Sequence, residues 1–351
     1  MRSAPELEPL VDVAALTSYL RTRLPNVDGE TVEVERHMAG HSNETFFVRL
    51  GDSELVLRRP PRGAFLPTAH DVGREYRVLS ALDGTSVRAP RPVLFCDDAT
   101  VIGAPFYLME RVEGVVIRDR LPEPFASEES TRRGLGDELV DALVELHAVD
   151  WRQAGLEGFG KPSGYLQRQI RRWSGQLELT EPMTRVVTEL HQVTDWLRSH
   201  VETLEETPPT VVHGDYKMDN VMYAAGEPAR LAAILDWEMS TIGDPRADLG
   251  WMVSFWREAG DAVAIDLEGD APTRLLGFQS RDELIARYEV RSGRPVGDLT
   301  FFTVLAVWKL AILLEGSYAR HLAGLTDDPF FAQLGDGVPS LGQRALELTT
   351  S

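Results

Sequence analysis

Short apolar runs separated by turn-forming residues fill the first third of the chain and predict a sheet. The runs are rich in Val, Leu, Phe and Tyr and are bounded by Gly, Pro, Asn and Asp, which is the pattern of strands joined by turns. Strands are expected at residues 31–38, 45–50, 54–59, 93–96 and 106–114. Apolar residues also recur at helical spacing in 10–24 and 70–82, so two helices should accompany the sheet.

Helical periodicity dominates the rest of the chain. Residues 131–149 are the clearest case, with a stripe of leucines every three or four positions. Further helices are expected at 251–257, 281–291 and 301–314. The last run is the most apolar, but it has fourteen residues and contains Lys309, whereas a membrane-spanning helix needs about 20. We therefore expect a buried helix and no membrane partner.

Length and composition narrow the function classes. A chain of 351 residues exceeds one average domain, so two lobes or domains are expected, each with its own core. The net charge of −19 argues against a nucleic-acid partner, because binding to phosphate backbones needs a basic face. The single cysteine, Cys96, excludes an internal disulfide and suits a reducing cytoplasm. No apolar segment in the first thirteen residues matches a secretory signal, so a cytoplasmic location is expected.

Three polar acceptors follow short apolar runs in the middle of the chain. One run leads into His213-Gly214-Asp215, Asn220 comes next, and a second run ends at Asp236. Phosphoryl transfer to a hydroxyl needs a carboxylate that accepts the proton and hard oxygen ligands for Mg²⁺. Asp215 suits the first task, and Asn220 and Asp236 suit the second. A His-Gly-Asp turn can also be a plain tight loop, so the prediction rests on the order and spacing of all three acceptors.

The pattern H-x-D-x-x-x-x-N followed by D-W-E resembles the catalytic loop and metal-binding turn of the aminoglycoside phosphotransferase and choline kinase family, relatives of the protein kinases. The segment GDPRADL at 243–249 extends the likeness. The resemblance implies a two-lobe α+β protein-kinase-like fold. It places a small sheet-rich nucleotide-binding lobe at residues 1–112 and a larger, mainly helical catalytic and substrate-binding lobe at 113–351.

The same resemblance implies roles for individual residues. Asp215 is expected to be the catalytic base, Asn220 and Asp236 to hold Mg²⁺, and Asp248 to be a buried carboxylate that braces the catalytic loop. His213 is expected to pack under the loop without taking part in the chemistry.

The segment between the first two predicted strands has two interpretations. The simple one is a hairpin turn. The other is a loop that covers nucleotide phosphates, in which Gly40 permits close approach of the backbone while Ser42 or Asn43 offers further hydrogen-bond donors. The segment lacks the G-x-G-x-x-G pattern, so both interpretations stay open.

The strand at 54–59 ends in two arginines. In the resembling family this strand carries a basic residue that faces the nucleotide phosphates, commonly lysine, and here Arg58 matches the position, with Arg59 as the alternative. A glutamate on the following helix orients that residue in the family, so Glu75 is expected to pair with Arg58. A solvent-exposed carboxylate is the other interpretation of Glu75.

The strand at 106–114 ends in a glycine, which the resemblance identifies as the hinge between the lobes. In the family the main chain of this segment contacts the adenine edge. Glu110 and Val112 are therefore expected to bind the base of ATP through their backbone groups.

Residues 159–173 and 235–251 resemble the phosphotransferase-like domains fused to some acyl-CoA dehydrogenases more closely than they resemble resistance enzymes. The implied activity is ATP- and Mg²⁺-dependent transfer of a phosphoryl group to a small-molecule hydroxyl. The implied acceptor is a hydroxyl-bearing metabolite or hydroxyacyl compound. An aminoglycoside-like antibiotic is the competing acceptor, because five carboxylates and no basic residue lie between Glu258 and Asp270.

Two other function classes compete with a kinase. A nucleotide-binding regulator of kinase shape would not turn over, but it would need no base at Asp215. A metal-dependent hydrolase could use His213, Asp215 and Asp236, although such sites are usually richer in histidine.

Overall fold

A computed structural model describes residues 10–24, 31–37, 43–61, 71–261, 271–325 and 329–350. The chain divides into two compact units. Unit 1 comprises Met1–Thr85 and Ala89–Glu113, and unit 2 comprises Ser86–Arg88 and Gly114–Ser351. The nucleotide-binding and catalytic roles expected of the two parts remain predictions.

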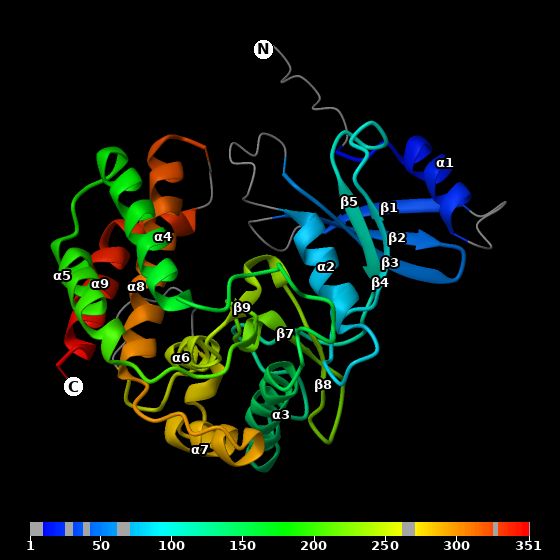
Figure 1. The fold of residues 1–351 in the computed structure, drawn as a ribbon. Helices are drawn as coiled ribbons and strands as arrows, with labels where there is room; N and C mark the ends of the chain where they lie inside the picture. The colour runs from blue at the N-terminus through cyan, green and yellow to red at the C-terminus, as the bar shows by residue number, and fades with distance from the viewer. Residues whose placement is uncertain are drawn as a thin grey trace. The chain divides into compact units, whose positions relative to one another are not determined.

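Unit 1 is built on a five-stranded antiparallel sheet with the strand order β1-β2-β3-β5-β4 (Figure 1). Its strands are β1 (Val32–His37), β2 (Glu44–Leu50), β3 (Ser53–Arg59), β4 (Pro92–Cys96) and β5 (Phe106–Glu110). The helices are α1 (Val13–Arg23) and α2 (Val72–Leu82), and the side chain of Asp71 caps the N-terminus of α2. The predicted hairpin of β1 and β2 is confirmed, whereas residues 38–42 between them lie outside the described residues.

The two faces of this sheet have different partners. Side chains alternate between faces along a strand, so Leu55 and Leu57 of β3 lie on one face and Arg58 lies on the other. Leu55 and Leu57 join the core cluster that contains residues of α1 and the fully buried Cys96. Arg58 instead pairs with Glu75 of α2, which packs against β4 and β5.

Unit 2 is mainly helical, with two small two-stranded sheets, β6 with β9 and β7 with β8 (Figure 1). Its helices are α3 (Glu129–His147), α4 (Tyr165–Thr180), α5 (Thr188–His200), α6 (Arg246–Phe255), α7 (Arg281–Ser292), α8 (Thr300–Leu322) and α9 (Leu334–Leu348). The strands are β6 (Thr210–Val212), β7 (Val221–Tyr223), β8 (Leu231–Ile234) and β9 (Thr241–Gly243). Short 3₁₀ helices are η1 (Glu181–Met183), η2 (Val201–Thr203), η3 (Met218–Asn220), η4 (Trp237–Met239), η5 (Pro272–Arg274) and η6 (Pro329–Gln333). The predicted α+β class, with a sheet-rich first part and a mainly helical remainder, is confirmed.

Two predicted helices have different bounds in the structure. The helix expected at 251–257 is α6, which both begins and ends earlier, at Arg246 and Phe255. Pro245 directly precedes it, and Asp244 accepts the Arg246 backbone N–H at 2.9 Å. The helix expected at 301–314 is α8, which continues to Leu322. It extends past its apolar run because Glu315, which is fully buried, pairs with Arg185 at 3.1 Å.

Helix α8 lies at the centre of the helical packing. It contacts α4, α5, α6 and α9, and the indole N–H of Trp308 donates to the Leu190 carbonyl of α5 at 3.1 Å. Among the described helices, α8 alone has the length and apolar composition that could cross a membrane. However, 61% of its most apolar 18-residue window is buried inside the protein, which is the environment of a core helix.

Candidate catalytic site

The loop after β6 is held by a buried carboxylate on α6. Asp248 accepts the backbone N–H of His213 on one oxygen and the backbone N–H of Gly214 on the other, each at 2.7 Å. Gly214 has φ +86°, and a Cβ there would come within 2.6 Å of the Met239 carbonyl oxygen, so the turn requires glycine. The expected bracing role of Asp248 is confirmed.

Asp248 is itself kept ionised by its neighbours. Burial raises the pKa of its carboxyl group, but a hydrogen bond from His147 at 3.3 Å and another from the Gly214 N–H help to lower that pKa overall. A charged Asp248 is the stronger acceptor for the two loop amides.

His213 supports the loop from below. Its Nε2 lies 2.8 Å from the Leu235 carbonyl oxygen, and its Nδ1 accepts the Asp215 backbone N–H at 3.2 Å. These contacts require the tautomer with the proton on Nε2, and they use both ring nitrogens. The ring is fully buried and packs edge-on against Trp237 at 4.9 Å between centroids. The expected packing of His213 under the loop is confirmed, and its exclusion from the chemistry stays a prediction.

Asp215 and Asn220 form one hydrogen-bonded unit. The carboxamide nitrogen of Asn220 donates to Oδ2 of Asp215 at 2.7 Å and to the Asp215 backbone carbonyl at 2.8 Å. Burial raises the pKa of the Asp215 carboxyl group, the positive charges of Lys217 and Lys309 lower it, and the charge of Asp236 raises it further. The carboxylate thus lies among charges of both signs, in the same region as Asp236.

Asp236 occupies a special backbone position at the end of β8. It has φ 62° and ψ 71°, and it is the one described residue other than glycine with positive φ. Such a conformation costs about 1–3 kcal/mol and tends to occur at functional sites. The neighbouring Leu235 N–H donates to the backbone carbonyl oxygen of Asn220 at 2.8 Å, which ties the Asp236 turn to the loop that carries Asp215 and Asn220.

The donor set fits Mg²⁺. The side-chain nitrogen of Asn220 donates to Asp215, so the side-chain oxygen Oδ1 of Asn220 is the atom that can bind a cation. Asp236 offers a carboxylate. Two such oxygens suit Mg²⁺, which keeps several waters and binds nucleotide phosphates. In the described part of the chain, no group of three or more His, Cys, Asp or Glu side chains could hold a metal ion.

Unit 1 contains the expected ion pair. Nη1 of Arg58 lies 3.4 Å from Oε2 of Glu75, and these side chains are 11% and 0% exposed. The Tyr107 hydroxyl donates to the same Glu75 oxygen at 2.8 Å, and the Asn43 carboxamide donates to the other. Glu75 is therefore a buried carboxylate with three side-chain partners and not a solvent-exposed one.

Arg59, the alternative phosphate contact, points elsewhere. Its guanidinium donates to the Pro60, Leu10 and Ile102 carbonyl oxygens, the last at 3.0 Å, on the face that packs against α1. This leaves Arg58 as the better candidate.

The remaining predicted nucleotide contacts stay predictions. Asn43 is 7% exposed and its amide nitrogen is used by Glu75. Gly40 and Ser42 lie outside the described residues. In the segment expected to be the hinge, the Glu110 backbone N–H donates to the Arg91 carbonyl at 2.8 Å, so that N–H is engaged. Val112 is the second residue after the end of β5.

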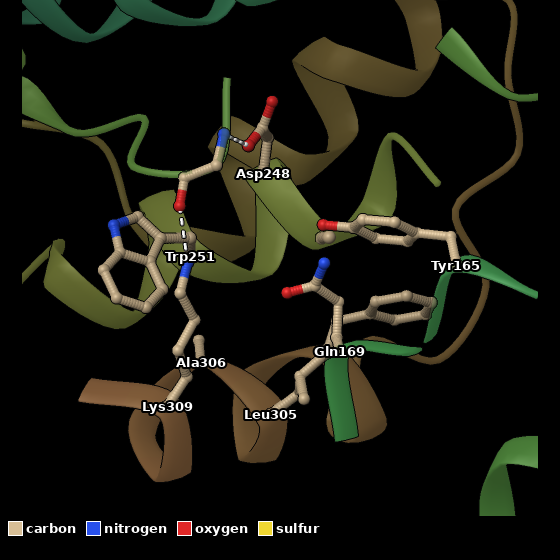
Figure 2. A pocket seen from close by; sticks show the side chains of 10 residues that line it. Tyr165, Gln169, Asp248, Trp251, Leu305, Ala306 and Lys309 are labelled. Carbon is tan, nitrogen blue, oxygen red and sulfur yellow. Dashed lines mark hydrogen bonds between the residues drawn. The ribbon is translucent and has the colours of Figure 1, made fainter. Parts of the chain in front are cut away.

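The sequence interpretation missed Lys309. This buried lysine of α8 donates from Nζ to the Gly214 carbonyl oxygen at 2.6 Å, shown as a dashed line in Figure 2. Its side chain lines a cavity of about 20 Å³, toward which the Tyr165 hydroxyl and the Gln169 carboxamide also point. The available signal was a single lysine inside the most apolar run of the chain, and it was used there only to argue against a membrane span.

Comparison with known families gives a match over most of the chain. The model of the phosphotransferase enzyme family matches residues 33–284. Acyl-CoA dehydrogenase family member 11 of Homo sapiens is 33% identical over 350 residues, which covers 96% of this chain and 43% of the relative. Family member 10 of Mus musculus is 32% identical over 337 residues, or 96% of this chain and 31% of the relative. The chain thus spans less than half the length of these relatives.

Solved structures share the fold. A putative aminoglycoside phosphotransferase from Ralstonia eutropha is 31% identical, with a TM-score of 0.80 and coverage of 97% of this chain and 98% of that one. A thermostable mutant of aminoglycoside phosphotransferase APH(4)-Ia, solved with AMP-PNP and hygromycin B, is 14% identical, with a TM-score of 0.62 and coverage of 95% of this chain and 98% of that one. The second likeness shows the fold alone.

Proposed function

Since the chain belongs to the phosphotransferase enzyme family, we propose that it transfers the γ-phosphoryl group of ATP to a hydroxyl group of a small molecule. The observation that carries the proposal is the Asp215–Asn220 unit, tied through Leu235 to Asp236 and braced by Asp248. It combines a proton acceptor with two hard oxygen donors on one hydrogen-bonded framework.

Asp215 acts as the base. Its Oδ2 is held by Asn220, and no described residue hydrogen-bonds its Oδ1, so Oδ1 is the oxygen that receives the acceptor's proton. As the O–H bond breaks, the acceptor oxygen bonds to the γ-phosphorus, the bond from that phosphorus to the bridging oxygen breaks, and ADP leaves. Burial and the charge of Asp236 raise the pKa of Asp215, which makes it a better proton acceptor when ionised.

The remaining residues bind and orient the reactants. Mg²⁺, held by Asn220 and Asp236, would neutralise negative charge on the phosphates. Within unit 1, Arg58, oriented by the buried Glu75, is the cation that we propose for contact with nucleotide phosphate. Positioning and charge neutralisation account for most of the rate in reactions of this class, and these residues supply both.

The acceptor we propose is a hydroxyl-bearing metabolite or hydroxyacyl compound. The alternative acceptor is an aminoglycoside bound by the acidic segment between Glu258 and Asp270. One carboxylate of that segment is already paired in the structure. Asp261 pairs with the guanidinium of Arg281 and accepts the Glu258 backbone N–H at 2.9 Å, so its charge is already compensated. Asp266 and Asp270 lie outside the described residues.

A transfer assay with γ-labelled ATP and Mg²⁺ tests the proposal. The acceptor panel contains hydroxyacyl-CoAs, choline-like alcohols, amino sugars and macrolides, and Asp215→Asn serves as the matched inactive control. We expect labelled product from a hydroxyacyl or other metabolic acceptor with the wild type alone. Label transfer to kanamycin-type compounds that Asp261→Asn abolishes would overturn the metabolic assignment. Equal product from wild type and Asp215→Asn would overturn the mechanism.

A further inference from the structure

We infer that Lys309 is a positioning residue, whose ammonium group fixes the carbonyl of Gly214 and with it the peptide that carries Asp215. The inference rests on the proposed function, because it assigns to Lys309 the task of orienting the base.

Gly214 is held from both sides by side chains of different helices. Asp248 of α6 accepts its backbone N–H at 2.7 Å, and Lys309 of α8 donates to its carbonyl oxygen at 2.6 Å. The next N–H along the chain, that of Asp215, donates to His213 Nδ1 at 3.2 Å. Glycine has the widest conformational freedom of all residues, so these contacts remove freedom where it would otherwise be greatest.

Several neighbours of Lys309 interact favourably with its ammonium group. Nζ lies 4.2 Å from the centroid of the Trp251 ring, a cation–π distance. Asp215 and Asp248 provide negative charge, and Arg172 of α4 provides positive charge. The residue is 8% exposed, so solvent screens these interactions weakly.

Lys309 does not stabilise the fold through its charge. Burial lowers the pKa of Lys309 to about 8, with Asp215 and Asp248 acting in the opposite direction. A lysine whose pKa falls on folding makes an unfavourable contribution to stability while it is protonated. Removal of the charge is therefore expected to leave the free energy of unfolding unchanged or higher, even though the loop loses a hydrogen bond.

Direct contact with the acceptor is the competing role for Lys309. The cavity between Lys309, Gln169 and Tyr165 measures about 20 Å³. That volume suits one water molecule, which needs about 10–15 Å³ on this measure. The ammonium group of Lys309 already donates to the Gly214 carbonyl oxygen at 2.6 Å, so the geometry favours positioning.

The test compares Lys309→Met, Lys309→Arg and Lys161→Met. Lys161 is an exposed lysine and serves as the matched control. The reaction is hydrolysis of Mg-ATP without an acceptor, in which water replaces the hydroxyl compound. We expect Lys309→Met to keep the wild-type melting temperature and KM for ATP while its kcat falls by about 10²-fold, the scale of a small misplacement of a catalytic group. Lys309→Arg should restore most of the turnover, because arginine also donates to a carbonyl.

Hydrogen exchange gives a second readout that needs no turnover. The amides of residues 213–216 should exchange faster in Lys309→Met than in the wild type or Lys161→Met, while amides of α8 stay protected. The positioning role is overturned if Lys309→Met leaves kcat unchanged or leaves the exchange rates of the 213–216 amides unchanged. It is also overturned if the KM for an identified acceptor rises while kcat stays the same. Absence of Mg-ATP turnover in the wild type with every acceptor defeats the proposed function, while the exchange comparison still decides the role of Lys309.

Discussion

The side-chain nitrogen of Asn220 donates two hydrogen bonds to Asp215, one to the carboxylate Oδ2 at 2.7 Å and one to the backbone carbonyl at 2.8 Å. The two residues are five positions apart, and the turn of η3 brings them together. The same amide that would present its oxygen to a cation therefore sets the orientation of the proposed base. Substitution of either residue is expected to affect the other.

Replacement of the base should separate chemistry from binding. Asp215→Asn retains the size of the side chain and can still meet Asn220 through its amide oxygen, so folding and Mg-ATP affinity should persist. Transfer should fall by at least about 10²-fold, the usual contribution of a positioned proton acceptor. Single-turnover kinetics with calorimetry of nucleotide binding measures both quantities. Near wild-type turnover in this variant would remove Asp215 from the mechanism.

Loss of the proposed metal ligands should affect nucleotide binding only through Mg²⁺. Asp236→Asn and Asn220→Ala are expected to weaken ATP binding in the presence of Mg²⁺ more than ATP binding in EDTA, because each removes a hard oxygen donor. Titration calorimetry under both conditions gives the comparison. Equal losses with and without the metal would contradict the assignment and point to misfolding.

The Arg58–Glu75 pair should behave as one unit. Arg58→Ala and Glu75→Ala are each expected to raise the KM for ATP, and their effects should be non-additive by about 0.5–3 kcal/mol, as for contacting residues in one network. Glu75→Ala should also lower stability, since it leaves Tyr107 and Asn43 without their shared acceptor. A double-mutant cycle on KM and on urea unfolding tests this. Strict additivity in both would mean that the pair does not act together.

The lowered pKa of Lys309 predicts a pH dependence of stability. Its pKa falls from 10.5 to about 8 on folding, so between these pH values the unfolded chain holds a proton that the folded chain has released. Stability rises with pH wherever the unfolded state binds more protons. The difference in unfolding free energy between the wild type and Lys309→Met should therefore increase from pH 8 to pH 10 in favour of the wild type. Urea unfolding of both proteins across this range measures it, and a constant or falling difference contradicts it.

The sequence revealed the polar residues of the proposed site because they lie close together along the chain. Asp215 and Asn220 share one short loop, and Asp236 follows a recognisable apolar run, so spacing alone brought them into one hypothesis. The partner of Arg58 could be inferred only through the family resemblance, because Glu75 lies on a helix that packs onto the sheet.

Lys309 could not be found in the same way. It is 95 residues from Gly214, and the packing of α8 against α6 and α4, not a local pattern, brings its ammonium to the loop. Helix bounds failed for a similar reason. The extension of α8 depends on the pairing of Glu315 with Arg185, which lies 130 residues away. Long-range pairs of this kind leave no periodic signal in one sequence.

Cys96 gives the protein a natural reporter. It is the sole cysteine of the chain, it is 1% exposed, and it belongs to the core cluster of unit 1. A thiol reagent can reach it only when that sheet opens, so the labelling rate in native buffer follows the opening of unit 1 alone. Global unfolding measured by urea includes unit 2 as well. Comparison of the labelling rate with the urea unfolding measurement assigns each destabilising substitution to its own unit without any engineered probe.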